Sequence, residues 1–298
     1  MKRYFLFLFI GLLFLEAGSQ TQFLKPSDSL NLKRKKAVVI TQASAYTIGI
    51  LGLNELWYKD YPRSKFHTLD DADEWLQMDK LGHSFSTYHL TRLGAETMAW
   101  SGADKKTQLV YGIVSGLTFV TAVEVLDGYS EEWGFSWSDV AANVAGTGLY
   151  VGQELLWEEQ RILLKYSFHQ TKYADQNPDK LGEGLAQEIF KDYNGQTYWL
   201  SANINSFVKS ETFPQWLNFA VGYGGEGMLT GVSDADDMFM NQDRNRQLYL
   251  SLDIDLSRIK TNSHFLKTVF SVFNTLKVPF PALEFSSGSK PKFHWMYF

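Results

Sequence analysis

The sequence predicts a mainly α-helical protein: a four-helix, membrane-associated bundle with a small β-stranded and aromatic appendage at its C-terminal end. Four long segments between residues 37 and 158 contain few charges and have the length of helices. Small residues recur in them at four-residue intervals, a spacing that allows close helix contact in membranes. These pairs are Gly112 and Gly116, Ala142 and Gly146, and Gly148 and Gly152. Strand-like alternation of apolar and polar residues begins only beyond Pro214.

The first 19 residues have the pattern of a secretory signal peptide. A basic start at residues 2–3 precedes an apolar run at residues 4–15, and small residues suited to cleavage follow at 17–19. The run is too short to cross a bilayer, which takes about 20 apolar residues. The competing interpretation is an uncleaved signal anchor. We therefore predict export to the cell envelope by a signal peptide.

Composition narrows the classes of partner. The formal charge is −5 and the only dense basic cluster is short, at residues 33–36, so we predict no nucleic-acid partner. Membrane lipid or an envelope component is the expected partner. After signal cleavage the basic cluster would start outside the cytoplasm, against the positive-inside bias, which favours a periplasmic or outer-membrane-associated location. The absence of cysteine excludes disulfides, thiolate ligands and a lipid-modified cysteine.

The chain divides into four parts. Residues 1–19 are the signal peptide, residues 20–36 a flexible lead-in, and residues 37–158 the helical bundle, with helices expected at 37–58, 75–100, 107–127 and 138–157. Residues 159–298 are predicted to be a mixed α/β region, with strands near 216–223 and 247–256 and a helix near 264–276. The aromatic tail from residue 292 resembles the last strand of an outer-membrane barrel, but three or four strands cannot close one.

Five polar residues occupy helix positions where apolar side chains are expected, and they define the candidate site: Asp79, His83, Glu124, Asp139 and Asn143. Asp79 and His83 are four residues apart, as are Asp139 and Asn143, so each pair shares a helix face. Buried ionisable groups are costly unless they are partnered. His83 is the candidate acid–base group, while Glu124 and Asp139 are candidates to bind a metal or orient water.

Asp79, Lys80 and Asn143 are the candidate binding residues. If the polar side chains converge, they can hold a divalent cation with oxygen and nitrogen ligands. They can equally form a hydrogen-bonded network that fixes helix register. Asp79 and Asp139 also have a structural explanation as helix-start residues, since Ser136 lies three residues before Asp139 as in a capping box. The pattern identifies neither the metal nor any other cofactor.

Three motifs, in this order, resemble a known family. They are W-L-Q-M-D-K-L-G-H-S-F (75–85), E-V-L-D-G (124–128) and F-S-W-S-D-V-A-A-N-V-A-G-T-G (135–148). Together they resemble the YfiM-like family of predicted periplasmic proteins of unknown function. The order is also similar to that of VanZ-like membrane proteins, which are associated with glycopeptide resistance. The resemblance covers about residues 37–157. The residues that match the family motifs by position are Asp79, Lys80, His83, Glu124, Asp139, Asn143 and Gly146. The resemblance implies a site at these residues but no particular reaction.

Two functions remain open. The leading hypothesis is a cell-envelope protein whose membrane-associated bundle carries a buried polar cluster with a binding or structural role. The alternative is an envelope hydrolase or transferase, with or without an assisting metal, that acts on a lipid-linked or cell-wall substrate. The chain contains none of the HExxH, GxSxG, Walker or dinucleotide-binding motifs, so no known enzyme signature favours the alternative.

Overall fold

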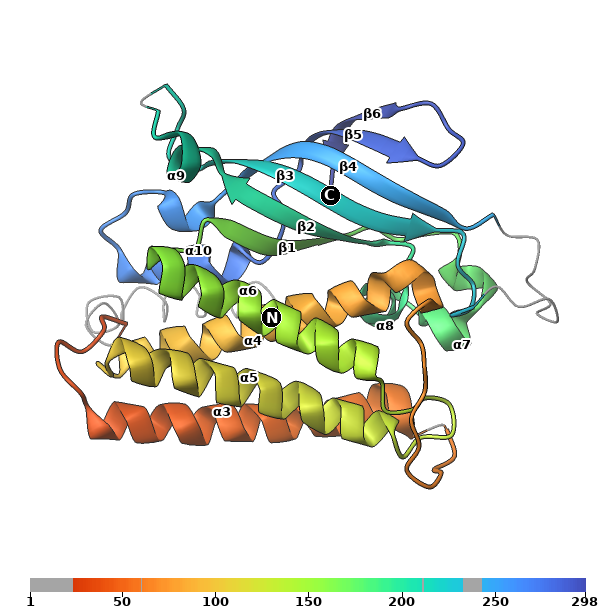
Figure 1. Cartoon of the computed structure of the whole chain (residues 1–298), viewed down its shortest axis with the longest axis horizontal. Coiled ribbons are helices and arrows are strands. Elements are labelled where there is room, and N and C mark those ends of the chain that lie inside the picture. Colours follow the sequence, from red (N-terminus) through yellow and green to blue (C-terminus); the bar gives the residue numbers. More distant parts are fainter. Residues whose placement is uncertain (1–23, 60, 211, 233–242) are drawn as a thin grey trace, which may run out of the picture.

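The computed structural model describes residues 24–59, 61–210, 212–232 and 243–298. The predicted signal peptide lies outside these ranges. The structure is 50% helical and 20% strand, with eight α-helices and a six-stranded antiparallel sheet among the described residues. The prediction of a mainly α, four-helix bundle is therefore wrong. The C-terminal half forms a full sheet that lies over the long helices as a second layer, rather than a small appendage (Figure 1).

Labels follow Figure 1. The long helices are α3 (Leu32–Leu53), α4 (Met78–Trp100), α5 (Lys105–Asp127) and α6 (Trp137–Trp157). The short helices are α7 (Pro178–Leu181), α8 (Leu185–Lys191), α9 (Ile204–Val208) and α10 (His264–Phe273). The strands are β1 (Ile162–Phe168), β2 (Gln196–Asn203), β3 (Leu217–Glu226), β4 (Asn245–Ile254), β5 (Phe280–Ser286) and β6 (Lys292–Tyr297).

The long helices begin where polar side chains cap their free amides. Asn31 caps α3, Asp104 caps α5 and Ser136 caps α6, each by accepting hydrogen bonds from backbone amides of the first turn. The predicted helical segments at 75–100, 107–127 and 138–157 agree with α4, α5 and α6 to within about three residues. The exception is α3, which begins at Leu32, so the end of the predicted flexible lead-in is helical.

Helix α4 has no such cap. It follows a left-handed turn at residues 75–77, with φ angles of 49°, 53° and 65°. Non-glycine residues in this region cost about 1–3 kcal/mol each and persist only where surrounding contacts enforce them. The sheet supplies two such contacts: Tyr223 Oη donates to the Leu76 carbonyl (2.6 Å), and the Arg246 guanidinium donates to the Gln77 side chain (2.7 Å).

Helix α4 packs mainly against α5 and α6, and glycines allow the close approach. A Cβ atom at Gly112 would lie 2.5 Å from the Thr91 carbonyl oxygen, and one at Gly146 would overlap the Ser84 carbonyl. Gly148 and Gly152, by contrast, face open space. The small-residue spacing therefore predicts contact correctly at Gly112 and Gly146, but not at the last pair.

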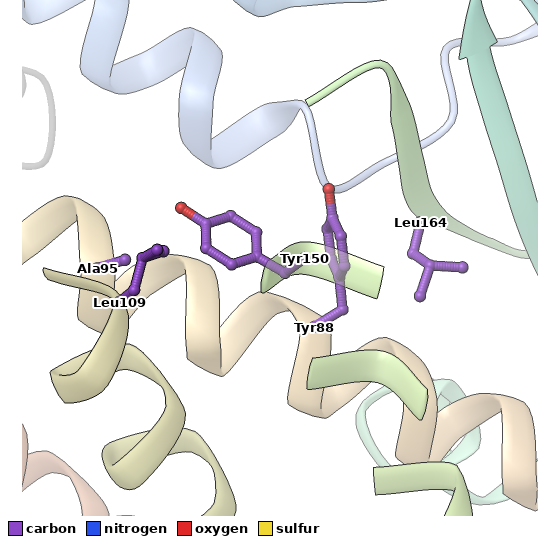
Figure 2. Packing of buried hydrophobic residues seen from close by; sticks show 5 residues of the cluster. All are labelled: Tyr88, Ala95, Leu109, Tyr150 and Leu164. Atoms are coloured by element: carbon purple, nitrogen blue, oxygen red, sulfur yellow. The ribbon is translucent and has the colours of Figure 1, made fainter. Parts of the chain in front are cut away.

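A cluster of buried side chains joins the helices to the sheet (Figure 2). It comprises Tyr88 and Ala95 from α4, Leu109 from α5, Tyr150 from α6 and Leu164 from β1. The Tyr88 and Tyr150 rings meet edge to face, with centroids 5.8 Å apart. Burial of these apolar groups fixes the sheet on α4 and α6.

The sheet is a meander in which each strand pairs with the next, in the order β1-β2-β3-β4-β5-β6. The segment before β5 returns to β1: the Tyr166 amide donates to the Thr275 carbonyl (3.0 Å), and the Lys277 amide donates to the Tyr166 carbonyl (2.9 Å). These two hydrogen bonds join the ends of a curved sheet. On its inner side, the aromatic rings of Trp199 (β2), Tyr249 (β4) and Tyr297 (β6) pack together.

Two described helices, α3 and α5, are long and apolar enough to cross a membrane. The apolar part of α5 is 33% buried in the protein and that of α3 only 11%. Length and composition alone are weak evidence for a membrane span, because core helices and signal sequences share them. Membrane association therefore stays a prediction at this level.

The glycine contacts predict opposite effects for two substitutions in α6. Gly146→Ala should destabilise the protein by about 2 kcal/mol, because the new methyl group forces α6 away from α4. Gly148→Ala should be neutral or stabilising by up to about 1 kcal/mol, because alanine is the better helix former and the site is open. Denaturant unfolding of both variants measures the difference. Equal effects would show that α6 does not depend on this contact.

His89 predicts a loss of stability in acid. Its Nε2–H donates to the Leu164 carbonyl of β1 (2.8 Å), and burial, reinforced by the charge of Arg92, lowers the pKa of His89 to about 3. Below about pH 6.5, His89 is protonated in the unfolded chain but stays neutral in the folded chain. The free energy of unfolding therefore falls as pH drops from about 6.5 toward 3. His89→Gln keeps a hydrogen-bond donor but cannot be protonated in this range. Between pH 6.5 and 5, its free energy of unfolding should fall by about 1–2 kcal/mol less than that of the wild-type protein.

Thermal unfolding of the wild-type protein and His89→Gln across this pH range tests that slope. Parallel stability curves for the two proteins would contradict a neutral, buried imidazole.

Candidate functional site

The start of α4, the end of α5 and the start of α6 meet, and His83 stands at the meeting point. Its Nδ1 lies 3.2 Å from Asn143 Oδ1 and 3.3 Å from Glu124 Oε1. Its Nε2 lies 3.8 Å from both Asp79 Oδ1 and Asp139 Oδ1. The other four polar residues that the sequence singles out thus lie around the His83 imidazole. Their catalytic or binding roles stay predictions, because proximity alone does not test a reaction.

Lys80 joins the same cluster and meets three carboxylates. Its Nζ lies 2.8 Å from Asp71, 3.0 Å from Asp79 and 2.7 Å from Asp139. The Lys80 side chain is only 13% exposed, so these contacts are poorly screened by water. One ammonium group therefore ties the loop before α4 to the first turns of α4 and α6.

Asp71 and Tyr193 belong to the site but were not predicted from the sequence. Asp71 Oδ1 accepts hydrogen bonds from the hydroxyls of Ser136 (2.6 Å) and Ser138 (2.7 Å). Tyr193 Oη donates to Asp79 Oδ1 (2.6 Å). Asp71 is one of several acidic residues in a polar loop, and nothing in that run distinguishes it. Tyr193 precedes β2, in the part of the chain for which no elements were predicted.

The helix-start explanations account for only part of the two aspartates. The Asp139 amide donates to Ser136 Oγ (3.1 Å), as a capping box requires, but the Asp139 carboxylate turns to Lys80 instead of the backbone. Asp79 lies in the first turn of α4 but is not its N-cap, which is Gln77. Both carboxylates therefore serve the cluster.

Two carboxylate oxygens in the cluster are poorly satisfied. Glu124 is 1% exposed, and its Oε1 accepts no hydrogen bond from the described residues. Asp139 Oδ1 is buried and likewise lacks a well-oriented hydrogen bond within the described chain, although it forms the ion pair with Lys80. Buried polar atoms normally have partners, so Glu124 Oε1 marks an unmet demand for a donor or for positive charge, whereas Asp139 Oδ1 already faces the Lys80 ammonium group.

The pKa values reflect the same crowding of negative charge. Burial raises the pKa of Asp139 to about 7; the charge of Asp79 adds to the shift, while His83 and Lys80 oppose it. Burial also opposes ionisation of Asp79, but the charges of His83 and Lys80 hold its pKa below the ordinary value. Burial disfavours the imidazolium of His83, yet the surrounding carboxylates, Asp79 first, raise its pKa. The cluster thus favours the charged form of His83 and disfavours ionisation of Asp139.

Three of these side chains can act together as metal ligands. Asp79, His83 and Asp139 each offer one ligand atom, and the three atoms lie within 4.8 Å of one another. The 3.8 Å separation of His83 Nε2 from each aspartate oxygen is close to the roughly 3.4 Å expected between ligands of a tetrahedral site with bonds of about 2.1 Å. Asp79 and His83 are partly exposed, so solvent reaches the cluster.

Comparison with known proteins supports a periplasmic family. Residues 69–153 match the model of a family described as a predicted periplasmic lipoprotein (DUF2279), whose function is unknown. The match spans less than a third of the chain, but it includes Asp71 and all six residues predicted for the site. No curated protein and no solved structure matches the chain. The sequence has no cysteine to carry the lipid that the family description implies.

The contacts of Lys80 predict a strong dependence of stability on its charge. Lys80→Met leaves three carboxylates without their shared cation and should destabilise the protein by about 3 kcal/mol. Lys292→Met is the matched control, because Lys292 also faces a carboxylate, Glu284 at 3.9 Å, but is 68% exposed. This control should change stability by no more than about 0.5 kcal/mol. Denaturant unfolding in buffer with a chelator measures the free energy of unfolding of both variants. Similar decreases for the two variants would mean that water screens the charges of the cluster as effectively as those at the surface.

Proposed function

We propose that this chain is a cell-envelope protein whose charged cluster binds a divalent cation. One observation carries the proposal: Asp79, His83 and Asp139 present converging ligand atoms next to Glu124, whose buried Oε1 accepts no hydrogen bond from the described residues. Carboxylates gathered in a poorly hydrated site repel one another unless positive charge is supplied. A cation supplies that charge.

The balance of charge supports an added cation over a purely internal network. Four carboxylates, those of Asp71, Asp79, Glu124 and Asp139, lie around two basic groups, Lys80 and His83. An internal network is satisfied when each charge has its partner. Here Glu124 Oε1 faces the imidazole without a hydrogen bond of acceptable geometry from the described residues. Burial raises the pKa of Glu124 to about 8, so a proton neutralises this carboxylate at pH 7, and a bound cation would replace that proton.

The mixed ligand set favours a transition-metal ion. An imidazole nitrogen with carboxylate oxygens suits Zn²⁺ or Mn²⁺, whereas Ca²⁺ and Mg²⁺ prefer oxygen ligands alone. Tyr193 donates to Asp79, an outer contact of the kind that orients ligating carboxylates. Lys80 competes for the same aspartates, so the bound ion must displace or share its ammonium group.

The cellular setting is part of the proposal. The signal-peptide pattern and the match to a periplasmic family both support an envelope location. The resemblance to YfiM-like and VanZ-like proteins adds a membrane as the expected neighbour, and membrane lipid or another envelope component as the partner. We place the binding function at that boundary.

Calorimetric titration of the chelator-treated full chain tests the proposal. Zn²⁺ or Mn²⁺ should bind with a stoichiometry of about one and raise the unfolding temperature, since a ligand that binds only the folded state stabilises it. Asp139→Asn should weaken binding about tenfold or more. Glu284→Gln is the matched control: it alters another carboxylate–histidine pair, with His294 Nε2 at 2.6 Å, outside the cluster. This control should bind as the wild-type protein does.

Lys80→Met sharpens the test, because removal of the competing ammonium group should raise cation affinity and let the cation restore stability. If neither protein binds a cation, the proposed function is wrong. If only Lys80→Met binds, the lysine itself is the permanent cation of the site, and the proposed function is equally overturned.

A further inference from the structure

The side of the sheet that faces away from its filled interior carries a continuous apolar surface. Cross-strand pairing places one residue from each of five strands in a single row: Leu200, Val221, Leu250, Leu283 and Phe293. All five side chains are exposed, by 38–50%. Phe219 pairs with Leu252 and Leu248 with Phe285, and these exposed residues widen the row on both sides. We call these nine residues the outer sheet face.

The opposite side of the same strands is buried, and it carries polar groups beside the rings of Trp199, Tyr249 and Tyr297. Lys165 and Asp253 form an ion pair of 2.8 Å with both side chains fully buried. Ser201 donates to Asp253 (2.7 Å), and Asn203 donates to Asn218 (2.8 Å). A sheet with one face in water normally shows the reverse pattern, apolar inward and polar outward. An apolar outer side over an interior that contains polar groups is the pattern found where lipid covers the outer side of a sheet.

We propose that the outer sheet face lies against the hydrocarbon of a lipid bilayer. The proposal rests on the membrane association proposed above but not on the cation site. An exposed apolar surface of this size is normally shielded from water by a binding partner. Two partners can shield it here: the lipid of a bilayer or a second copy of the chain. The position of α3 decides between them.

Helix α3 is the second exposed apolar surface, and other long helices separate it from the sheet. In Figure 1 the sheet lies above the layer of α4 and α6, while α3 lies below α5. Ile40, Ile48 and Leu51 of α3 are exposed, as are Val114 and Val125 of α5. One partner copy covers one side of a molecule. A bilayer surrounds it and covers both sides at once.

The dimensions agree with this arrangement. The 22 residues of α3 are about 33 Å long at 1.5 Å per residue, close to the thickness of a hydrocarbon core of about 30 Å. The apolar part of β4, from Leu248 to Ile254, is about 20 Å long, near the height of about 25 Å of the apolar band on membrane sheets. Figure 1 shows α3 and β4 running in roughly the same direction, so both can match the same bilayer.

Charge placement also fits. Residues 33–36 carry four basic side chains at the first turns of α3, where lipid headgroups would lie. Trp295 of β6 is 80% exposed beside Phe293, with ring centroids 5.1 Å apart, as expected for an aromatic pair at a lipid boundary.

Single-cysteine labelling tests the proposal directly, because the chain has no cysteine of its own. The full chain is reconstituted into phosphatidylcholine vesicles with a fluorophore at Leu250→Cys or Leu283→Cys. Lys290→Cys, at an exposed position in the turn between β5 and β6, is the control. Brominated acyl chains should quench the first two labels several-fold more than the control, and aqueous iodide should show the opposite order.

Two outcomes would overturn the proposal. Iodide quenching at Leu250 and Leu283 as strong as at Lys290 would show a face open to water. Protection from both quenchers, with energy transfer between labels on different chains, would show a second copy as the cover. The same labels in an Asp139→Asn background separate this result from the cation site: lipid quenching should persist while cation binding is lost.

Discussion

The three carboxylates around the Lys80 ammonium are the interaction on which the rest of the structure depends. They come from the loop before α4, from α4 itself and from α6, so one cation fixes three separate parts of the chain. Glycines at the contacts allow α4 to lie close to α5 and α6. His83, one turn further along α4, is then enclosed by oxygens from three helices.

The sequence predicts the helical part of the molecule and most of the cluster for clear reasons. Spacing of four residues places Asp79 with His83 and Asp139 with Asn143, whatever the surrounding fold. Convergence of those pairs on Glu124 needs tertiary packing, which the glycine spacing indicated only in part. Asp71 could not be chosen from its acidic loop, because its role comes from Lys80 and two serines that reach it across the fold.

Most of the sheet was not predicted from the sequence, because some of its strands bury polar side chains where a core strand normally buries apolar ones. In β1 the buried Lys165 and in β2 the buried Ser201 break the apolar pattern that marks a core strand, and both are satisfied by Asp253 of β4. Partners so distant in sequence cannot be read from local alternation. The predicted strands near 216–223 and 247–256 agree with β3 and β4, where outward leucine, valine and phenylalanine give a regular period of two.

The left-handed turn at residues 75–77 connects the two halves of the molecule energetically. It is strained, and it is held by side chains of β3 and β4 directly before the helix that carries Asp79 and Lys80. A displacement of the sheet would release these hydrogen bonds and let the turn relax, which would move the first turn of α4. The turn therefore couples the position of the sheet to the position of the helix that carries Asp79 and Lys80.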